Sequence, residues 1–202
     1  MRILLASANP DKRAELEKLL EGLPIEVLSL AQFPDAPQVV EDGETFEENA
    51  AKKAAEIAQY SGLHTVADDS GLCVDALDGA PGVQSARYAG QHGTYKDVCK
   101  KLLLKMRYVP DEKRTARFLC HIAFADPEGN ILLTAKGSVE GLITRQMRGG
   151  RGFGYDPVFL YPPAGKTFAQ MTPEEKNRFS HRARAMEEFR EKVKVFLPAL
   201  AQ

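Results

Sequence analysis

The first thirty residues alternate between two patterns, and this alternation constrains the fold more than any other feature of the chain. A short apolar run over 2–6 predicts a buried strand. The chain then breaks at 7–11 and becomes helical over 12–21, with leucines on one side, and a second strand is expected near 25–28. A strand, a helix and a strand in this order favour an α/β domain.

Later segments extend this prediction. Thr45 and Glu48 form a capping box that predicts a helix to about Tyr60, and a short strand over 64–67 follows it, ending at Asp68. Apolar residues at helical spacing over 98–106 predict another helix.

The second half of the chain adds a hairpin and two helices. Residues 116–124 and 131–139 alternate between apolar and polar on either side of a turn, which predicts antiparallel strands and hence a mixed sheet. A second capping box begins at Thr172, and the last helix is expected to stop before Pro198. We therefore predict one α/β domain covering residues 1–202.

Charge and cysteine content exclude several classes of protein. The 27 Lys and Arg residues nearly balance the 28 Asp and Glu residues, so a global electrostatic grip on nucleic acid or an anionic membrane is not expected. No apolar run is long enough to span a bilayer, and the N-terminal apolar stretch is too short for a signal peptide. The three widely spaced cysteines fit neither a disulfide framework nor a zinc site. We therefore predict that the protein is located in the reducing cytoplasm.

The turn over 7–12 joins the first strand to the first helix and offers a hydroxyl, an amide and a lysine. Backbone donors at a helix N-terminus form a natural seat for phosphate. The alternative is that Asn9 or Asp11 simply caps the helix, as such residues do in most proteins.

Two acidic segments, 41–44 and 68–71, are candidates for cation binding. Magnesium takes one or two protein carboxylates together with water and phosphate oxygens. The alternative for the second segment is a polar turn. Lys53 lies on the apolar stripe of the second predicted helix, which suggests that this stripe lines a cleft. The alternative is that Lys53 lies at the margin of the stripe and extends its ammonium group to water.

The segment 149–157 holds four glycines and two aromatic residues, which allow close backbone approach and ring stacking. With nearby arginines it could also be an RNA-binding segment, although one short stretch is weak evidence for that. Lys176 and the run 180–182 add donors near the last helix. Acidic residues gather near 41–48 and 68–78, and basic residues gather near 145–151 and 176–184. A metal ion bound to a polyphosphate would balance the charges of both groups.

Six motifs occur in order from residue 7 to residue 182: Ser7-x-Asn9-x-x-Lys12, Glu41-x-Gly43-x-Thr45-Phe46-x-x-Asn49-Ala50, Ala67-Asp68-Asp69-Ser70-Gly71-Leu72, Gly79-Ala80-Pro81-Gly82-Val83-x-Ser85-Ala86-Arg87-Tyr88, Gly152-Phe153-Gly154-Tyr155-Asp156-Pro157 and Ser180-His181-Arg182. Together they resemble the Ham1/RdgB-type inosine triphosphate pyrophosphatases. One departure is Ala8, where the family often has glycine; it trims backbone freedom but leaves the hydroxyl, Asn9 and Lys12 in place.

The resemblance implies an ITPase-like α/β fold (Ham1/Maf type), with a mixed central sheet flanked by helices and two lobes around a deep cleft. It implies a homodimer that uses one or more Mg²⁺ ions per subunit to hydrolyse ITP, dITP and XTP to the monophosphate and pyrophosphate, removing deaminated purines from the nucleotide pool. No stable nucleic acid partner and no membrane are expected.

The resemblance also implies roles for individual residues. Glu41 and Asp69 would hold the metal, with Asp69 as the candidate general base. The remaining positions would bind substrate, the first seven at the triphosphate and the others at the nucleotide: Ser7, Ala8, Asn9, Pro10, Asp11, Lys12 and Lys53, then Ser70, Phe153, Gly154, Tyr155, Asp156, Lys176, His181 and Arg182.

Two other functions remain open from the residues. A protein that senses nucleotides or RNA without hydrolysis would keep the lysines and the glycine-aromatic segment, but would not need Glu41 and Asp69 together. A pyrophosphatase for modified pyrimidine nucleotides is less favoured, because the motif at 180–182 belongs to the purine side of the resemblance.

Overall fold

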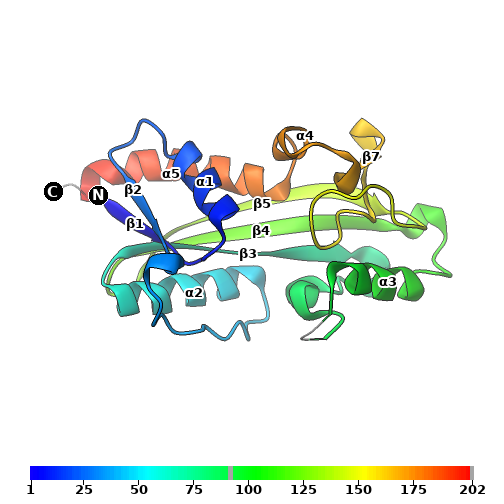
Figure 1. The fold of residues 1–202 in the computed structure, drawn as a ribbon, viewed down its shortest axis with the longest axis horizontal. Helices are drawn as coiled ribbons and strands as arrows, with labels where there is room; N and C mark the ends of the chain where they lie inside the picture. Colours follow the sequence, from blue (N-terminus) through cyan, green and yellow to red (C-terminus); the bar gives the residue numbers. More distant parts are fainter. Residues whose placement is uncertain (91–92, 201–202) are drawn as a thin grey trace. The chain divides into compact units, whose positions relative to one another are not determined.

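The computed structural model describes residues 1–90 and 93–200, apart from the side chains of Asp11 and of residues 197–200 (Figure 1). Seven strands form one sheet in the order β2-β1-β3-β4-β5-β6-β7. They are β1 (Arg2–Leu5), β2 (Glu26–Ser29), β3 (His64–Val74), β4 (Thr115–Ala125), β5 (Ile131–Ile143), β6 (Phe159–Tyr161) and β7 (Lys166–Thr167). The α-helices are α1 (Pro10–Leu19), α2 (Phe46–Ser61), α3 (Tyr95–Lys105), α4 (Pro173–Asn177) and α5 (His181–Leu200).

The sheet is mixed, as predicted. β1 pairs in parallel with β2 and with β3, whereas β6 pairs antiparallel with β5 and with β7. The predicted strand–helix–strand opening is therefore confirmed, and α1 is the helix that connects its two parallel strands. Among the described residues, no helix is both long and apolar enough to cross a membrane.

The chain divides into two compact units, each built from segments that are distant in sequence. Unit 1 comprises residues 1–69, 120–137 and 184–202, and unit 2 comprises residues 70–119 and 138–183. Each unit has its own apolar interior.

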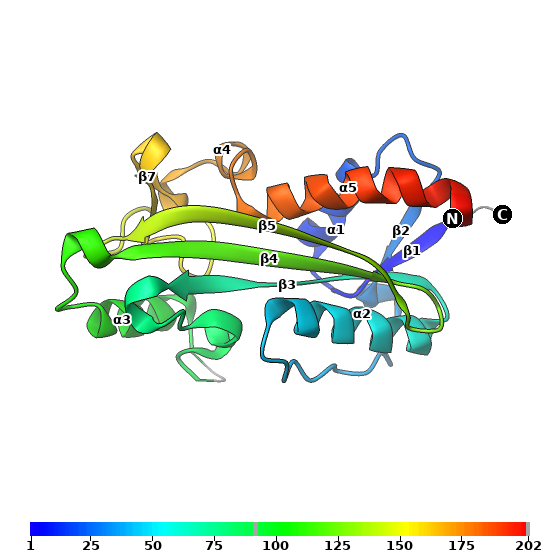
Figure 2. The ribbon, with the colours of Figure 1, turned by 180° about the vertical axis from the view of Figure 1, so that it is seen from behind.

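Unit 1 has a core on each face of its part of the sheet. On one face, α1 and α5 pack on alternate strand residues such as Ile3, Val66 and Phe124. On the other face, α2 packs its alanines and Ile57 on the intervening residues, among them Ala67. Figure 2 shows α5 and α2 covering these opposite faces. The alternation arises because successive side chains of a strand point to opposite sides.

Unit 2 has one core, to which α3 contributes Val98, Cys99 and Leu102. A buried guanidinium group, that of Arg114, joins the end of α3 to the end of β5. Its nitrogens donate to the carbonyl oxygens of Met106, Val109, Ile143 and Thr144 at 2.7, 3.3, 2.7 and 2.8 Å. These bonds satisfy a charge that burial would otherwise make costly, and they anchor the start of the segment 145–157.

Both predicted capping boxes are present. The hydroxyl oxygen of Thr45 accepts from the backbone N–H of Glu48, and that of Thr172 accepts from the N–H of Glu175. Each glutamate bonds back to the cap residue, so the local sequence fixes where α2 and α4 begin.

Two predicted boundaries are wrong. The strand expected to end at Asp68 continues to Val74, because Leu72 and Val74 pack into the core of unit 2 and this packing outweighs the low strand propensity of Asp and Gly. The last helix does not stop before Pro198 but runs to Leu200. A proline so close to a helix end removes few intrahelical hydrogen bonds.

Candidate functional site

The turn between β1 and α1 is shaped by its own polar groups. Ser7 Oγ accepts from the N–H of Asn9 at 3.2 Å, and Asn9 Oδ1 accepts from the N–H of Lys12 at 3.4 Å. Asn9 therefore caps α1, with Pro10 as the first helical residue, where proline is favoured. Ala8, Asn9 and Pro10 are exposed, so their backbone is accessible to a ligand.

Lys12 extends from this helix to β3. Its Nζ donates to both carboxylate oxygens of Asp68, at 3.0 and 3.1 Å. The Asp68 side chain is only 4% exposed, whereas that of Lys12 is 26% exposed. The buried carboxylate is thus balanced by a lysine whose ammonium group still reaches the surface.

Lys53 forms a second such pair. Its Nζ donates to Glu41 Oε1, which joins the middle of α2 to the loop that precedes this helix. Both side chains are partly buried, at 17% and 33% exposure. The interpretation of Lys53 as a residue that only extends to water is therefore wrong, because its ammonium group contacts a predicted site residue.

Asn49 connects the same loop to β3. Its Nδ2 donates to Asp69 Oδ2 at 3.1 Å, and its Oδ1 accepts from the N–H of Gly43 at 2.8 Å. Asn49 is 1% exposed and lies in the first turn of α2, one helical turn before Lys53. Asn49 was not among the predicted site residues, although it belongs to the second of the six motifs.

Asp68 and Asp69 point to opposite faces of the sheet. Both lie within β3, where adjacent side chains alternate, and their partners come from α1 and α2 respectively. The two neighbouring carboxylates of the predicted acidic segment therefore do not share one environment. Only Asp69 lies on the same face as α2, the helix that carries Asn49 and Lys53.

The oxygen donors of this group fit a magnesium ion. Magnesium prefers hard oxygen ligands and takes one or two protein carboxylates, completing its shell with water and phosphate. Glu41 and Asp69 offer such carboxylates, and Asn49 ties together the segments that carry them. Among the described residues, no group of three or more His, Cys, Asp or Glu side chains suited to a metal is found.

In unit 2, Asp156 and Lys176 form a buried ion pair. Lys176 Nζ donates to Asp156 Oδ2 at 2.6 Å, and the Asp156 side chain is 3% exposed. Burial raises the pKa of Asp156, and the positive charge of Lys176 only partly offsets this. Lys176 also lies 4.7 Å from the centre of the Phe153 ring and 5.5 Å from that of Phe168, so its ammonium group is held on several sides.

The segment that carries Phe153 and Asp156 is tightly fixed. Burial raises the pKa of Tyr155, which keeps its proton and donates from Oη to the carbonyl oxygen of Ser85 at 2.9 Å. Burial raises the pKa of the Cys99 thiol to about 11, and its Sγ contacts the carbonyl oxygen of Gly154 at 3.3 Å. Phe153 itself is 57% exposed, an aromatic ring presented to solvent from a rigid loop.

A backbone feature explains the glycine at position 152. Its φ is +73°, and a Cβ added there would lie 2.0 Å from Asp156 Oδ2. The N–H of Phe153 donates to the same oxygen at 3.0 Å. Gly152 therefore allows the loop to close on the Asp156 carboxylate, as the glycine-rich pattern predicted.

The start of α5 carries the remaining predicted donors. Ser180 Oγ accepts from the N–H of Ala183 at 3.2 Å, so Ser180 caps the helix. The imidazole ring of His181 stacks on Phe118, with 4.8 Å between ring centres and 12° between planes. Arg182 follows in the first turn and is partly buried.

Four predicted site residues remain. Ser70 is half-buried in β3 of unit 2, Gly154 and Tyr155 serve the loop just described, and the side chain of Asp11 lies outside the described residues. Phe118 and Phe168, the rings that flank His181 and Lys176, were not predicted to belong to the site. The alternation of apolar and polar residues along this strand predicts that Phe118 is in the core. It does not predict that Phe118 stacks on His181.

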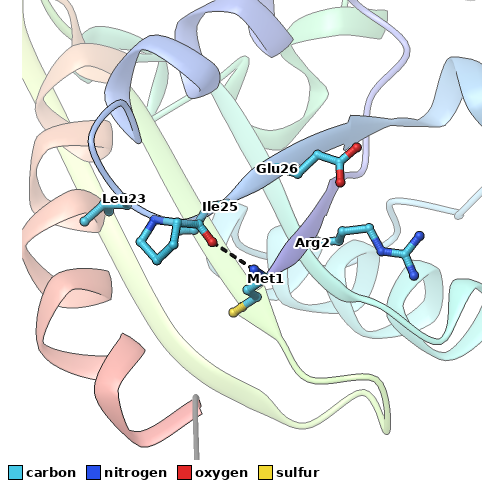
Figure 3. Close-up of a pocket in the computed structure, with 6 residues that line it drawn as sticks. Met1, Arg2, Leu23, Ile25 and Glu26 are labelled. Atoms are coloured by element: carbon cyan, nitrogen blue, oxygen red, sulfur yellow. Dashed lines mark hydrogen bonds between the residues drawn. The ribbon is translucent and has the colours of Figure 1, made fainter.

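A separate pocket lies at the other end of β1 and β2. It is lined by Met1, Arg2, Leu23, Pro24, Ile25 and Glu26, and the terminal ammonium group donates to the carbonyl oxygen of Pro24 at 2.8 Å (Figure 3). None of the predicted site residues lines it.

Taken unit by unit, the side chains suit two kinds of chemical group. In unit 1, the lysines suit a phosphate group and the carboxylates suit a cation. In unit 2, the exposed ring of Phe153 and the nearby ammonium group of Lys176 suit a planar, polar base. Both are typical of nucleotide-binding α/β proteins.

Comparison with known proteins identifies the family. The model of the Ham1 family matches residues 3–192, and the chain therefore belongs to the Ham1 family. A dITP/XTP pyrophosphatase of Geobacter sulfurreducens is 49% identical over 92% of each chain, and that of Leuconostoc mesenteroides is 48% identical over 98% of each. The solved structure of a HAM1 protein from Coxiella burnetii matches with a TM-score of 0.91 and 41% identity, over 96% of this chain and 98% of that one.

Proposed function

We propose that this chain hydrolyses the non-canonical purine nucleotides dITP, XTP and ITP to the nucleoside monophosphate and pyrophosphate. Its family and the names of relatives nearly half identical over almost their whole length support this activity. The structural observation that carries the proposal is the pairing within unit 1, where two lysines and a buried amide contact the acidic residues of two motifs.

The triphosphate end of the substrate is assigned to unit 1. Ser7 to Lys12 supply backbone and side-chain donors at the start of α1, and Lys12 and Lys53 supply positive charge. Both lysines have carboxylate partners in the structure, which neutralise them and hold them in place. Phosphate oxygens would take over part of that role, so that little reorganisation is needed on binding.

Asp69 is assigned the role of general base, and with Glu41 it would hold the metal. Magnesium, when bound by these two carboxylates, supplies positive charge for the phosphate oxygens of the transition state. The Asp69 carboxylate orients a water molecule and accepts its proton as that water attacks the α-phosphorus. Pyrophosphate is the leaving group, and Lys12 and Lys53 stabilise the charge that develops on it.

The nucleoside end is assigned to unit 2. Phe153 offers a stacking surface, and Ser70, Gly154 to Asp156, Lys176, His181 and Arg182 supply polar contacts. Hypoxanthine and xanthine carry an acceptor oxygen at position 6, where adenine carries a donor amine. Donors left unpaired against adenine cost about 1–3 kcal/mol each, so two mismatches give discrimination on the order of a thousandfold.

The test is phosphate release from dITP, XTP and ITP with magnesium, with and without added inorganic pyrophosphatase, and with ATP and GTP alongside. We expect signal only with the coupling enzyme and only for the non-canonical nucleotides. Direct release of orthophosphate would contradict attack at the α-phosphorus. Tight binding without hydrolysis would instead support a nucleotide sensor.

The proposal also covers the assembly and setting of the protein. We propose a homodimer in the cytoplasm, in which residues 1–202 form one catalytic domain. Size-exclusion chromatography with light scattering should give about twice the 22.3 kDa of the chain. A mass equal to that of the single chain would contradict the dimer without affecting the proposed reaction.

A further inference from the structure

The side-chain amide of Asn49 is buried, and both its donor and its acceptor form hydrogen bonds. It is almost fully buried, and burying an amide is costly unless its donor and its acceptor are both satisfied. Both are satisfied here, by Asp69 on one side and by the backbone of Gly43 on the other. An apolar residue of the same size could make neither bond.

The backbone around Asn49 holds this amide rigidly. Thr45 and Glu48 cap the helix on which it lies, and its neighbours Phe46 and Ala50 are buried. Gly43 comes close because it has no side chain: a Cβ there would lie 2.8 Å from Asn49 Oδ1 and 2.9 Å from Glu48 Cβ. The loop is thus fitted onto the Asn49 carbonyl group.

The two partners of Asn49 belong to the two segments that carry the proposed metal ligands. Asp69 is itself one of them, and Gly43 lies two residues after Glu41, the other. Glu41 is in turn paired with Lys53, which lies four residues after Asn49 and hence on the same side of α2. One helix face therefore contacts both acidic segments.

We propose that Asn49 is a positioning residue that fixes the Asp69 carboxylate relative to the loop carrying Glu41. It acts through these carboxylates and is not assigned any contact with the nucleotide. The inference rests on the proposed function, because Asp69 and Glu41 are assigned their roles there. Partners that orient metal ligands typically change metal affinity or activity about 10- to 100-fold when they are replaced.

Two substitutions separate the bonds of Asn49. Asn49→Ala removes both, whereas Asn49→Asp keeps an acceptor for Gly43 but cannot donate from an ionised carboxylate to Asp69. We expect both variants to lower kcat for dITP about 10- to 100-fold with little change in KM, because substrate contacts are intact. We expect a similar loss in Mn²⁺ affinity, measured by calorimetry on the nucleotide-free protein.

Ala54→Gly is the matched control. Ala54 is fully buried in the same helix, and glycine there destabilises α2 by about 1 kcal/mol without touching either acidic segment. This variant should keep the wild-type kcat and Mn²⁺ affinity. Thermal unfolding of each variant shows how much stability each substitution removes.

Wild-type kcat and Mn²⁺ affinity in Asn49→Ala or in Asn49→Asp would overturn the proposal. So would an equal loss of kcat in Ala54→Gly, since that would indicate general loosening of α2. The proposed function is tested separately by the wild-type protein alone, through pyrophosphate release from dITP. A wild-type protein without that activity would contradict the function, whereas the ratio of variant to wild type tests Asn49.

Discussion

Asp68 and Asp69 are adjacent in the chain, yet they bind partners on different helices. Asp68 pairs with Lys12 of α1, and Asp69 accepts a hydrogen bond from Asn49 of α2. The alternation of side chains along β3 produces this separation. The two carboxylates therefore have different environments, and replacing them should have different consequences.

Asp69→Asn should lower kcat for dITP by at least about a hundredfold, because an amide cannot act as a general base. Its fold should be retained, since asparagine has the same shape and can still accept from Asn49. Steady-state kinetics together with far-UV circular dichroism tests both statements. Near-normal turnover in this variant would contradict the assigned role.

Asp68→Asn should instead act on stability and on the placement of Lys12. Replacing a carboxylate that is 4% exposed leaves the partly exposed lysine with a weaker partner, at a cost of about 1–2 kcal/mol in the free energy of unfolding. Urea denaturation measures this loss. A variant as inactive as Asp69→Asn, at wild-type stability, would show that both carboxylates take part in the chemistry.

Arg182→Ala tests the assignment of the nucleoside end. We expect kcat/KM for ITP to fall about ten- to a hundredfold, because the proposed donor to the 6-oxo group is lost. Residual turnover of ATP should fall much less, since its 6-amino group cannot accept that bond. Arg178→Ala, at an exposed position after α4, is the control and should match the wild type. Equal losses for ITP and ATP would contradict a role in base selection.

Asp156 should make stability depend on pH in a direction unusual for a carboxylate. Burial raises the pKa of Asp156 in the folded protein above its unfolded value of about 3.9. The contribution of Asp156 to the free energy of unfolding is therefore largest below about pH 3.9 and falls as the pH rises through the folded pKa. The difference in unfolding free energy between wild type and Asp156→Asn should therefore shrink by up to about 1.4 kcal/mol per pH unit above pH 4.

Urea denaturation at a series of pH values measures this difference. The positive charge of Lys176 lowers the pKa of Asp156, so Lys176→Gln should raise that pKa further. In this variant, the contribution of Asp156 to stability should therefore continue to fall up to a higher pH. A difference that grows with rising pH would mean that the ion pair outweighs burial.

The hydrogen bond from Tyr155 to Ser85 should hold the aromatic loop in place. Tyr155→Phe leaves the buried carbonyl oxygen of Ser85 without this donor, at a cost of about 1–3 kcal/mol in stability. The KM for dITP should rise, because the loop also carries Phe153. Tyr108→Phe, at a residue that is 84% exposed, should change neither quantity. Unchanged stability and KM in Tyr155→Phe would contradict this view.

Much of the fold follows from local sequence. The capping boxes at Thr45 and Thr172 specify helix starts by short-range hydrogen bonds, and the alternation over 116–124 specifies a strand, so these elements were predictable. The extent of β3 was not, because Leu72 and Val74 are drawn into the strand by a core assembled from distant segments.

The site shows the same division. Site residues such as Glu41, Lys53 and Asp69 could be identified along the chain, but their partners could not. That Lys53 pairs with Glu41, and that Asn49 bridges Gly43 and Asp69, depends on how α2 packs against the sheet. Tertiary packing also decides that Asp68 faces α1, which the order of residues along the chain does not show.

Gly152 offers the most direct test of how tightly the glycine-rich loop closes on Asp156. Gly152→Ala forces an alanine into a φ of +73° and places its Cβ 2.0 Å from Asp156 Oδ2, so the carboxylate has to move. The conformational strain costs about 1–2 kcal/mol, and displacing the buried carboxylate from Lys176 and from the Phe153 N–H adds to it. We expect a lower unfolding free energy and a raised KM for dITP and XTP. Gly150→Ala is the matched control, because a Cβ there meets nothing within 4 Å. If both variants behave alike, the close approach at Gly152 does not matter for binding the base.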